Sequence, residues 1–199
     1  MKHKLPSGMH QMPRESKINI LVVDDDRGPR TLLKTALLDK GFQVSTAKSG
    51  EEACQAIDDC HFDLVLTDLK MPGLNGIVLL KKIKMRSPET LVILITGYSS
   101  LKSAIDAIRE GAYDYLTKPF QLDELYIVVN HACERINLIK ENSRLLDILK
   151  EIHEKAAKEA ENHDTPYSGH EDSLGLIQSL RQQLLKVYSR SAAPKTPQS

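Results

Sequence analysis

The chain has 199 residues, of which 41% are hydrophobic, enough for one sizeable core and an extension. Lys plus Arg (27) equals Asp plus Glu (27), so net charge gives no bulk attraction to nucleic acid or an anionic membrane. No apolar run approaches the roughly 20 residues that span a bilayer. Cys54, Cys60 and Cys133 have no C-x-x-C spacing, so we expect reduced thiols in a cytoplasmic protein.

Residues 1–16 mix Pro, Gly, His and Met without periodicity, and we expect a disordered leader without an apolar signal core. The first predicted strand, 18–23, is apolar nearly throughout, as in a strand covered on both faces. It runs into Asp24-Asp25-Asp26, and Asp26 is expected to cap the helix that follows. Pro29 suits the first turn of that helix and Gly41 its end.

Strands and helices then alternate at short spacing, which predicts an α/β fold. The expected strands are 43–47, 63–68, 91–95 and 113–117, and the expected helices are 49–59, 75–86 and 100–110. Such alternation is typical of a doubly wound, five-stranded parallel sheet with right-handed crossovers. In the flavodoxin-like order 2-1-3-4-5, the first and third strands lie side by side at the switch point, where ligands bind.

Acidic residues end both of those strands. Asp68 closes the strand 63–68 just before a Met-Pro-Gly turn, and Asp24 and Asp25 follow the first strand. These three carboxylates should converge, and their mutual repulsion must be offset by protons or a cation. Carboxylates without His or Cys favour a hard divalent cation, and we predict Mg²⁺.

Two further strands also end in polar residues, at the same end of the predicted sheet as the acidic residues. Lys118 follows the fifth strand and Thr96 the fourth. A nucleophilic carboxylate, a metal, an ammonium and a hydroxyl donor together suit phosphoryl transfer onto an aspartate. In that chemistry Asp68 is the acceptor, and Lys118 and Thr96 contact the phosphoryl oxygens.

Four segments carry a specific resemblance. They are Val22-Val23-Asp24-Asp25-Asp26, Leu66-Thr67-Asp68-Leu69-Lys70-Met71-Pro72-Gly73-Leu74-Asn75-Gly76, Ile95-Thr96-Gly97 and Tyr115-Leu116-Thr117-Lys118-Pro119-Phe120. In this order they resemble the receiver domain of bacterial two-component response regulators, and they look most like nitrogen-regulatory-type receivers. The resemblance covers residues 17–137, the expected receiver domain.

The resemblance implies that Asp68 accepts a phosphoryl group from a sensor histidine kinase or a phosphotransfer protein. It implies that Asp25, Asp68 and the Lys70 carbonyl bind Mg²⁺, with Asp24 assisting through water. Lys118 and Thr96 would contact the phosphate.

The resemblance also implies that Tyr115 is the aromatic switch and that the Lys118–Pro119 peptide is cis. Lys70 and Tyr98 would flank the water that attacks the acyl phosphate. Since neither is a good base, we expect a long-lived phosphorylated state.

After the receiver, a helix is expected from Leu122 to about residue 162, on the order of 60 Å long. Its apolar stripe fits a coiled-coil seam whose distal half is free for a partner: Leu125, Val129, Ala132, Ile136, Ile139, Ser143, Leu146, Leu149, Ile152 and Ala156. A turn at 163–169, a second amphipathic helix at 174–189 and a disordered tail at 191–199 are expected to follow. Residues 138–190 thus form a helical extension, either a coiled coil or a hairpin of the two helices, and we expect a homodimer through it.

The sequence contains neither a G-x-x-x-x-G-K-[ST] motif nor a basic recognition helix. DNA binding and enzymatic turnover are therefore not expected, and output should run through an unidentified protein partner. One alternative is a haloacid-dehalogenase-like phosphatase, but Lys70 stands where that class needs a second acid. Another is a phosphorelay or dimerising scaffold whose tail uses His131 or His153.

Overall fold

The computed structural model describes residues 17–97 and 101–161, and short helical stretches at 175, 178–180 and 182–183. Strands and helices alternate along the chain as predicted. The elements are β1 (Asn19–Val23), α1 (Arg27–Asp39), β2 (Gln43–Ala47), α2 (Gly50–Asp59), β3 (Leu64–Asp68), α3 (Gly76–Arg86), β4 (Leu91–Thr96), α4 (Leu101–Arg109), β5 (Asp114–Thr117) and α5 (Leu122–Glu161).

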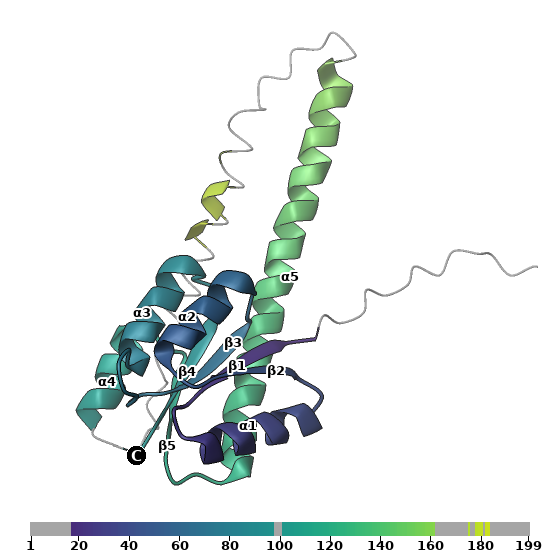
Figure 1. The fold of residues 1–199 in the computed structure, drawn as a ribbon. Coiled ribbons are helices and arrows are strands. Elements are labelled where there is room, and N and C mark those ends of the chain that lie inside the picture. Colours follow the sequence, from purple (N-terminus) through teal and green to yellow (C-terminus); the bar gives the residue numbers. More distant parts are fainter. Residues whose placement is uncertain (1–16, 98–100, 162–174, 176–177, 181, 184–199) are drawn as a thin grey trace, which may run out of the picture.

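The strands form one sheet in the order β2-β1-β3-β4-β5, with every neighbouring pair parallel. This confirms the doubly wound α/β fold. Helices α1 and α5 cover one face of the sheet, and α2, α3 and α4 cover the other (Figure 1). Strands β1 and β3 are neighbours, so the ends that carry the acidic residues meet at the switch point.

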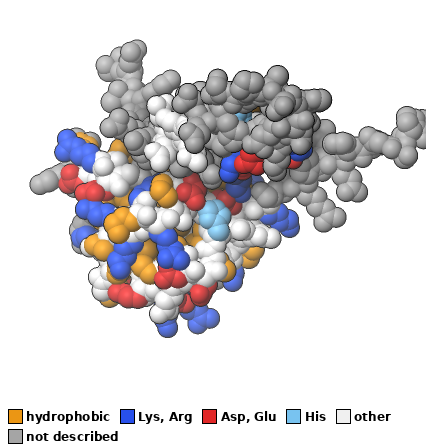
Figure 2. Space-filling model, turned by 90° about the horizontal axis from the view of Figure 1, so that it is seen from above, with side chains coloured by type: hydrophobic (Ala, Val, Ile, Leu, Met, Phe, Trp, Pro, Cys, Tyr) orange, Lys and Arg blue, Asp and Glu red, His pale blue; other side chains and the backbone are white. Residues whose placement is uncertain are grey.

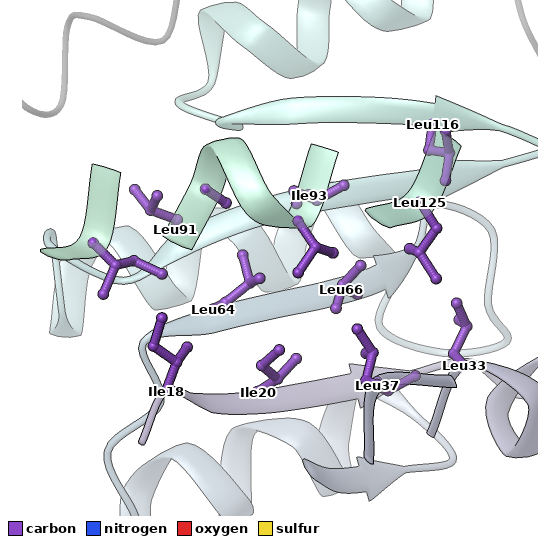
Figure 3. Close-up of a cluster of buried hydrophobic side chains, with 14 of the residues drawn as sticks. Ile18, Ile20, Leu33, Leu37, Leu64, Leu66, Leu91, Ile93, Leu116 and Leu125 are labelled. Carbon is purple, nitrogen blue, oxygen red and sulfur yellow. The ribbon is translucent and has the colours of Figure 1, made fainter. Parts of the chain in front are cut away.

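Alternate residues along the central strands supply two cores, one on each face. Ile20 and Leu66 pack on the side of α1 and α5, as Figure 3 shows, whereas Leu21 and Val65 pack under α2 and α3. All four side chains are fully buried. Because burial of each stabilises the fold by roughly 1.5–3 kcal/mol, the strands hold the site residues on a rigid frame.

Side-chain caps fix where three helices begin. Asp26 accepts the Gly28 N–H at 2.9 Å, which confirms its predicted role at the start of α1. Ser49 and Asn75 serve α2 and α3 in the same way. The chain therefore turns sharply after β1, which leaves Asp24 and Asp25 at the end of the sheet.

Helix α5 is one continuous helix of 40 residues and confirms the predicted extension beyond the sheet (Figure 1). Its first apolar stripe is buried against the sheet: Leu125, Val129, Ala132, Ile136 and Ile139. Beyond Ile139 the large apolar side chains that remain exposed lie on another side of the helix, so the single expected stripe divides into two. The predicted turn, the tail and most of the second helix lie outside the described residues.

Charges of both signs are interspersed over the described part of the face that Figure 2 shows, seen from the end at which α5 projects. Among the helices that could be placed, none is both long and apolar enough to cross a bilayer.

A buried carboxylate fastens α5 to the amino-terminal end of the central strands, where the projecting half of the helix begins. Asp63, which precedes β3, is 5% exposed. Its Oδ2 accepts the Asn19 N–H at 2.9 Å, and its Oδ1 lies 2.8 Å from the Lys140 ammonium. The contact joins β1, β3 and α5 at one point.

We expect Asp63→Ala to lower the free energy of unfolding by roughly 1–3 kcal/mol, since it leaves the Asn19 N–H without its acceptor and removes the contact between the carboxylate and Lys140. Urea denaturation measures the change. The matched control is Asp59→Ala, at an exposed helix end, which should stay within about 0.5 kcal/mol of the parent. Equal effects of the two substitutions would contradict this role for Asp63.

Candidate functional site

Three carboxylates meet at the carboxyl end of the sheet. Oxygen atoms of Asp24, Asp25 and Asp68 lie within 4.8 Å of one another, as the strand order predicted. Asp24 is buried, Asp68 is half-buried and Asp25 is exposed, so the cluster opens to solvent on one side. The Asp24 Oδ1 accepts the Asp26 N–H at 2.9 Å, and the Asp68 Oδ1 accepts the Lys70 N–H at 2.9 Å. Each of these two carboxylates is thus oriented by the loop that follows it.

Lys118 bridges two of the carboxylates. Its Nζ lies 2.8 Å from the Asp24 Oδ2 and 2.6 Å from the Asp68 Oδ2. Partial burial alone would lower the pKa of Lys118, but the hydrogen bonds with Asp24 and Asp68 outweigh it and raise that pKa. The side chain therefore remains an ammonium at neutral pH.

The backbone around Lys118 holds it at the end of β5. Its N–H donates to the Thr96 carbonyl at 2.7 Å, and the Lys118–Pro119 peptide is cis, as predicted. Lys118 thus reaches the acidic cluster from the strand two places away from β3.

Two residues that the sequence analysis did not single out hold the loop after Asp68. A Cβ at Gly76 would lie 2.4 Å from the Asp68 carbonyl oxygen, so only glycine permits this close approach of α3. Glu51, at the start of α2, accepts the Leu74 N–H at 2.9 Å. Hydrogen bonds from its own N–H and then from Leu74 lower the pKa of Glu51. The Pro-Gly turn had indicated the loop but not these contacts.

The other predicted residues that the structure describes lie on β4, on β5, on α5 and in the loop after Asp68. Thr96 ends β4 and is buried, one residue beyond Ile95, which is the register partner of Asp68. Tyr115, on β5, is 36% exposed and lies outside the core. The Lys70 side chain is exposed, and Tyr98 falls outside the described residues. Both candidate histidines lie on α5, His131 exposed and His153 half-buried.

The donor set fits a divalent cation. Three carboxylates carry a formal charge of −3, and the Lys118 ammonium offsets one unit, which leaves −2. A partly hydrated Mg²⁺ would balance that charge, and its preferred ligands are carboxylate and carbonyl oxygens. Asp25 and Asp68 are the less buried members of the cluster and could hold the ion together with the Lys70 carbonyl, assisted by the buried Asp24.

Comparison with known proteins agrees with this fold. Residues 20–130 match the family model described as the response regulator receiver domain. The chain therefore belongs to the response regulator receiver family, and its receiver is a signalling domain of two-component systems.

Among curated proteins, the chain is 41% identical over 122 residues to the regulatory protein AtoC of Escherichia coli K12. It is 42% identical over 111 residues to the DNA-binding transcriptional regulator NtrC of Klebsiella pneumoniae. These matches cover 61% and 56% of this chain but only 26% and 24% of the relatives. The similarity thus concerns about a quarter of each relative.

Solved structures of response regulators are also similar to this chain. A response regulator receiver domain protein from Clostridium thermocellum superposes with a TM-score of 0.58 at 39% identity, covering 61% of this chain and 98% of that one. NtrX from Brucella abortus gives a TM-score of 0.62 at 39% identity, covering 65% of this chain and 30% of that one.

Proposed function

We propose that the protein is a phosphorylation-dependent switch that accepts a phosphoryl group on Asp68 from a sensor histidine kinase or a phosphotransfer protein. The observation that carries the proposal is the contact of 2.6 Å between the Lys118 ammonium and the Asp68 Oδ2, beside two further carboxylates. An ammonium at this position can stabilise negative charge on the Asp68 carboxylate and, as the reaction proceeds, on the phosphoryl oxygens.

In the proposed step, a carboxylate oxygen of Asp68 attacks phosphorus and forms an O–P bond. The bond between phosphorus and the donor breaks, and the donor leaves with the electron pair. Lys118 exchanges its contact with Asp68 for one with a phosphoryl oxygen, and the Thr96 hydroxyl donates to another. A magnesium ion held by Asp25, Asp68 and the Lys70 carbonyl would offset the charge of the transferring group.

The switch would follow from these new bonds. Phosphorylation can shift the conformational equilibrium of the domain only if the phosphoryl group interacts more favourably with one conformation than with the other. Shifting that equilibrium from 1:99 to 99:1 takes a difference in interaction free energy of roughly 5.5 kcal/mol. If Thr96 moves toward the phosphate, Tyr115 can turn inward from its exposed position. The surface made by α4, β5 and α5 would change with it.

We propose that residues 17–137 form this receiver and that residues 138–190 carry the output through protein contacts, including a homodimer. The interspersed charges on the face of Figure 2 agree with output that does not use DNA. Three unpaired cysteines agree with a cytoplasmic location. We do not expect the chain to be an enzyme.

Acetyl phosphate tests the proposal directly. The full chain with acetyl phosphate and Mg²⁺ should gain the mass of one phosphoryl group, and the modification should be lost in mild base. A chelator should suppress the gain by at least about tenfold, since the metal offsets charge in the transition state. Intact-mass spectrometry measures both. Absence of any modification would contradict the proposal.

A chromogenic phosphate ester separates the switch from a phosphatase. We expect no sustained release of the chromophore, because a receiver is modified once and holds its phosphoryl group. The haloacid-dehalogenase-like alternative requires many turnovers per molecule. Turnover that disappears in Asp68→Asn would support that alternative.

A further inference from the structure

The loop between β3 and α3 carries one of the proposed metal ligands. It comprises residues 69–75, directly after Asp68, and includes the Lys70 carbonyl. Both ends of the loop are tied down: the Leu69 N–H donates to the Ile95 carbonyl at 2.8 Å, and the Gly76 N–H donates to the Leu69 carbonyl at 3.0 Å. A carbonyl on a loop binds a metal well only if the loop keeps one conformation, so the contacts along the rest of the loop bear on the site.

Glu51 contacts that loop from a different element. It stands in the first turn of α2, which lies beside α3 on the same face of the sheet (Figure 1). Its Oε1 accepts the Leu74 N–H at 2.9 Å. The same oxygen occupies the space beside Gly73, where an added Cβ would lie 2.7 Å from it. Glu51 thus contacts the loop at two consecutive residues.

The carboxylate of Glu51 is charged when it makes this contact. Hydrogen bonds from its own N–H and then from Leu74 lower its pKa, so it is ionised at neutral pH and accepts a charge-assisted hydrogen bond. Met71, three residues before Leu74, is buried in the core between the sheet and these helices. Packing therefore holds the loop at Met71 and Glu51 holds it at Leu74. The Lys70 carbonyl lies directly before the first of these points.

We propose that Glu51 is a positioning residue for the proposed metal site. By holding Leu74, it keeps the loop in the shape that brings the Lys70 carbonyl to a Mg²⁺ ion at the acidic cluster. Mg²⁺ demands near-ideal octahedral geometry, so even a small shift of one ligand lowers its affinity. The inference rests on the metal site of the proposed function and extends it to a residue outside the ligand set.

Titration of the full chain with Mg²⁺, without any phosphoryl donor, tests the inference. The amide signals of two-dimensional NMR spectra report binding. Glu51→Ala should raise the Mg²⁺ dissociation constant by about tenfold or more, because the Leu74 N–H loses its acceptor. Glu51→Gln keeps an oxygen that can accept this N–H, so its dissociation constant should stay within about threefold of the parent. Equal weakening by the two substitutions, or none by Glu51→Ala, would overturn the inference.

Glu52→Ala is the matched control. Glu52 follows Glu51 in the same turn of α2 and also accepts a backbone N–H, that of Lys48 at 3.0 Å. This hydrogen bond serves the loop before α2 and not the loop after Asp68. We therefore expect the Mg²⁺ dissociation constant of Glu52→Ala to stay within about twofold of the parent. If it rose as much as in Glu51→Ala, the start of α2 as a whole would set the affinity, and the role of the contact with Leu74 would be refuted.

Gly73 gives a second route to the same contact. Gly73→Ala places a methyl group 2.7 Å from the Glu51 Oε1 and should displace that carboxylate, which raises the Mg²⁺ dissociation constant by about threefold or more. In the Glu51→Ala background the methyl group has room, so the same substitution should have a smaller effect. The strain of an alanine at a φ of 73° is common to both backgrounds and cancels in the double-mutant cycle. Effects that simply multiply would show that the two residues do not act through one contact.

The outcomes separate this inference from the proposed function. With acetyl phosphate, Glu51→Ala should need about tenfold more Mg²⁺ for its half-maximal rate of phosphorylation, yet reach the rate of the parent at saturating Mg²⁺. A lower saturated rate with unchanged Mg²⁺ affinity would overturn the positioning role and leave the proposed acceptor in place. A parent protein that binds Mg²⁺ but gains no phosphoryl group would count against the proposed function alone. A parent protein that binds no Mg²⁺ would overturn the inference.

Discussion

Asp68→Asn should abolish phosphorylation by acetyl phosphate while the fold is retained. The amide oxygen is a poor nucleophile. Of the two carboxylates that contact Lys118, Asp24 is buried and Asp68 is partly exposed. The fold should survive because Lys118 keeps its contact of 2.8 Å with Asp24. Removing one of three crowded carboxylates also relieves repulsion, so in a chelator the variant should be at least as stable as the parent.

Asp26→Asn is the matched control for Asp68→Asn. Asp26 belongs to the same acidic region but caps α1, and asparagine is an equally good cap. We expect this variant to be phosphorylated like the parent, as measured by intact mass. If Asp68→Asn were phosphorylated to the same extent as the parent, the acceptor would lie elsewhere.

Lys118→Met should slow phosphorylation by about a hundredfold or more, the usual cost of removing a preorganised donor to a developing negative charge. It should also lower the free energy of unfolding in a chelator by roughly 1–3 kcal/mol, because the carboxylates of Asp24 and Asp68 lose their counter-charge. Mg²⁺ should restore more stability to this variant than to the parent, since the metal then becomes the main source of positive charge. Thermal unfolding at several Mg²⁺ concentrations measures this difference.

Lys81→Met is the control, because Lys81 also forms an ion pair, with Glu110 at 2.9 Å, but at an exposed site. We expect neither its phosphorylation rate nor its response to Mg²⁺ to differ from the parent. An unchanged phosphorylation rate in Lys118→Met would show that its contact with Asp68 has no part in the chemistry.

Much of the fold could be predicted because local patterns and topology agree. The apolar runs ended at polar residues or turns, so β2 was predicted at its observed bounds and the other elements within one or two residues. The strand order then placed the ends of β1 and β3 together, which brought Asp24, Asp25 and Asp68 to one rim without knowledge of any contact.

Other features depend on packing between distant segments and have no local signal. Glu51 contacts the loop after Asp68 only because α2 and α3 lie side by side. Asp63 meets Lys140 because α5 passes the amino-terminal end of β3 at that point. The two stripes of α5 could not be separated from spacing alone, since the division depends on where the sheet stops covering the helix.

The most direct test of the central claim is to locate the phosphoryl group. Protein treated with acetyl phosphate and Mg²⁺ is reduced with borohydride, which converts a phosphorylated aspartate to homoserine, and its peptides are sequenced by mass spectrometry. We predict homoserine at position 68 and at no other aspartate. Phosphate found instead as base-stable phosphohistidine at His131 or His153, with position 68 unmodified, would contradict the account.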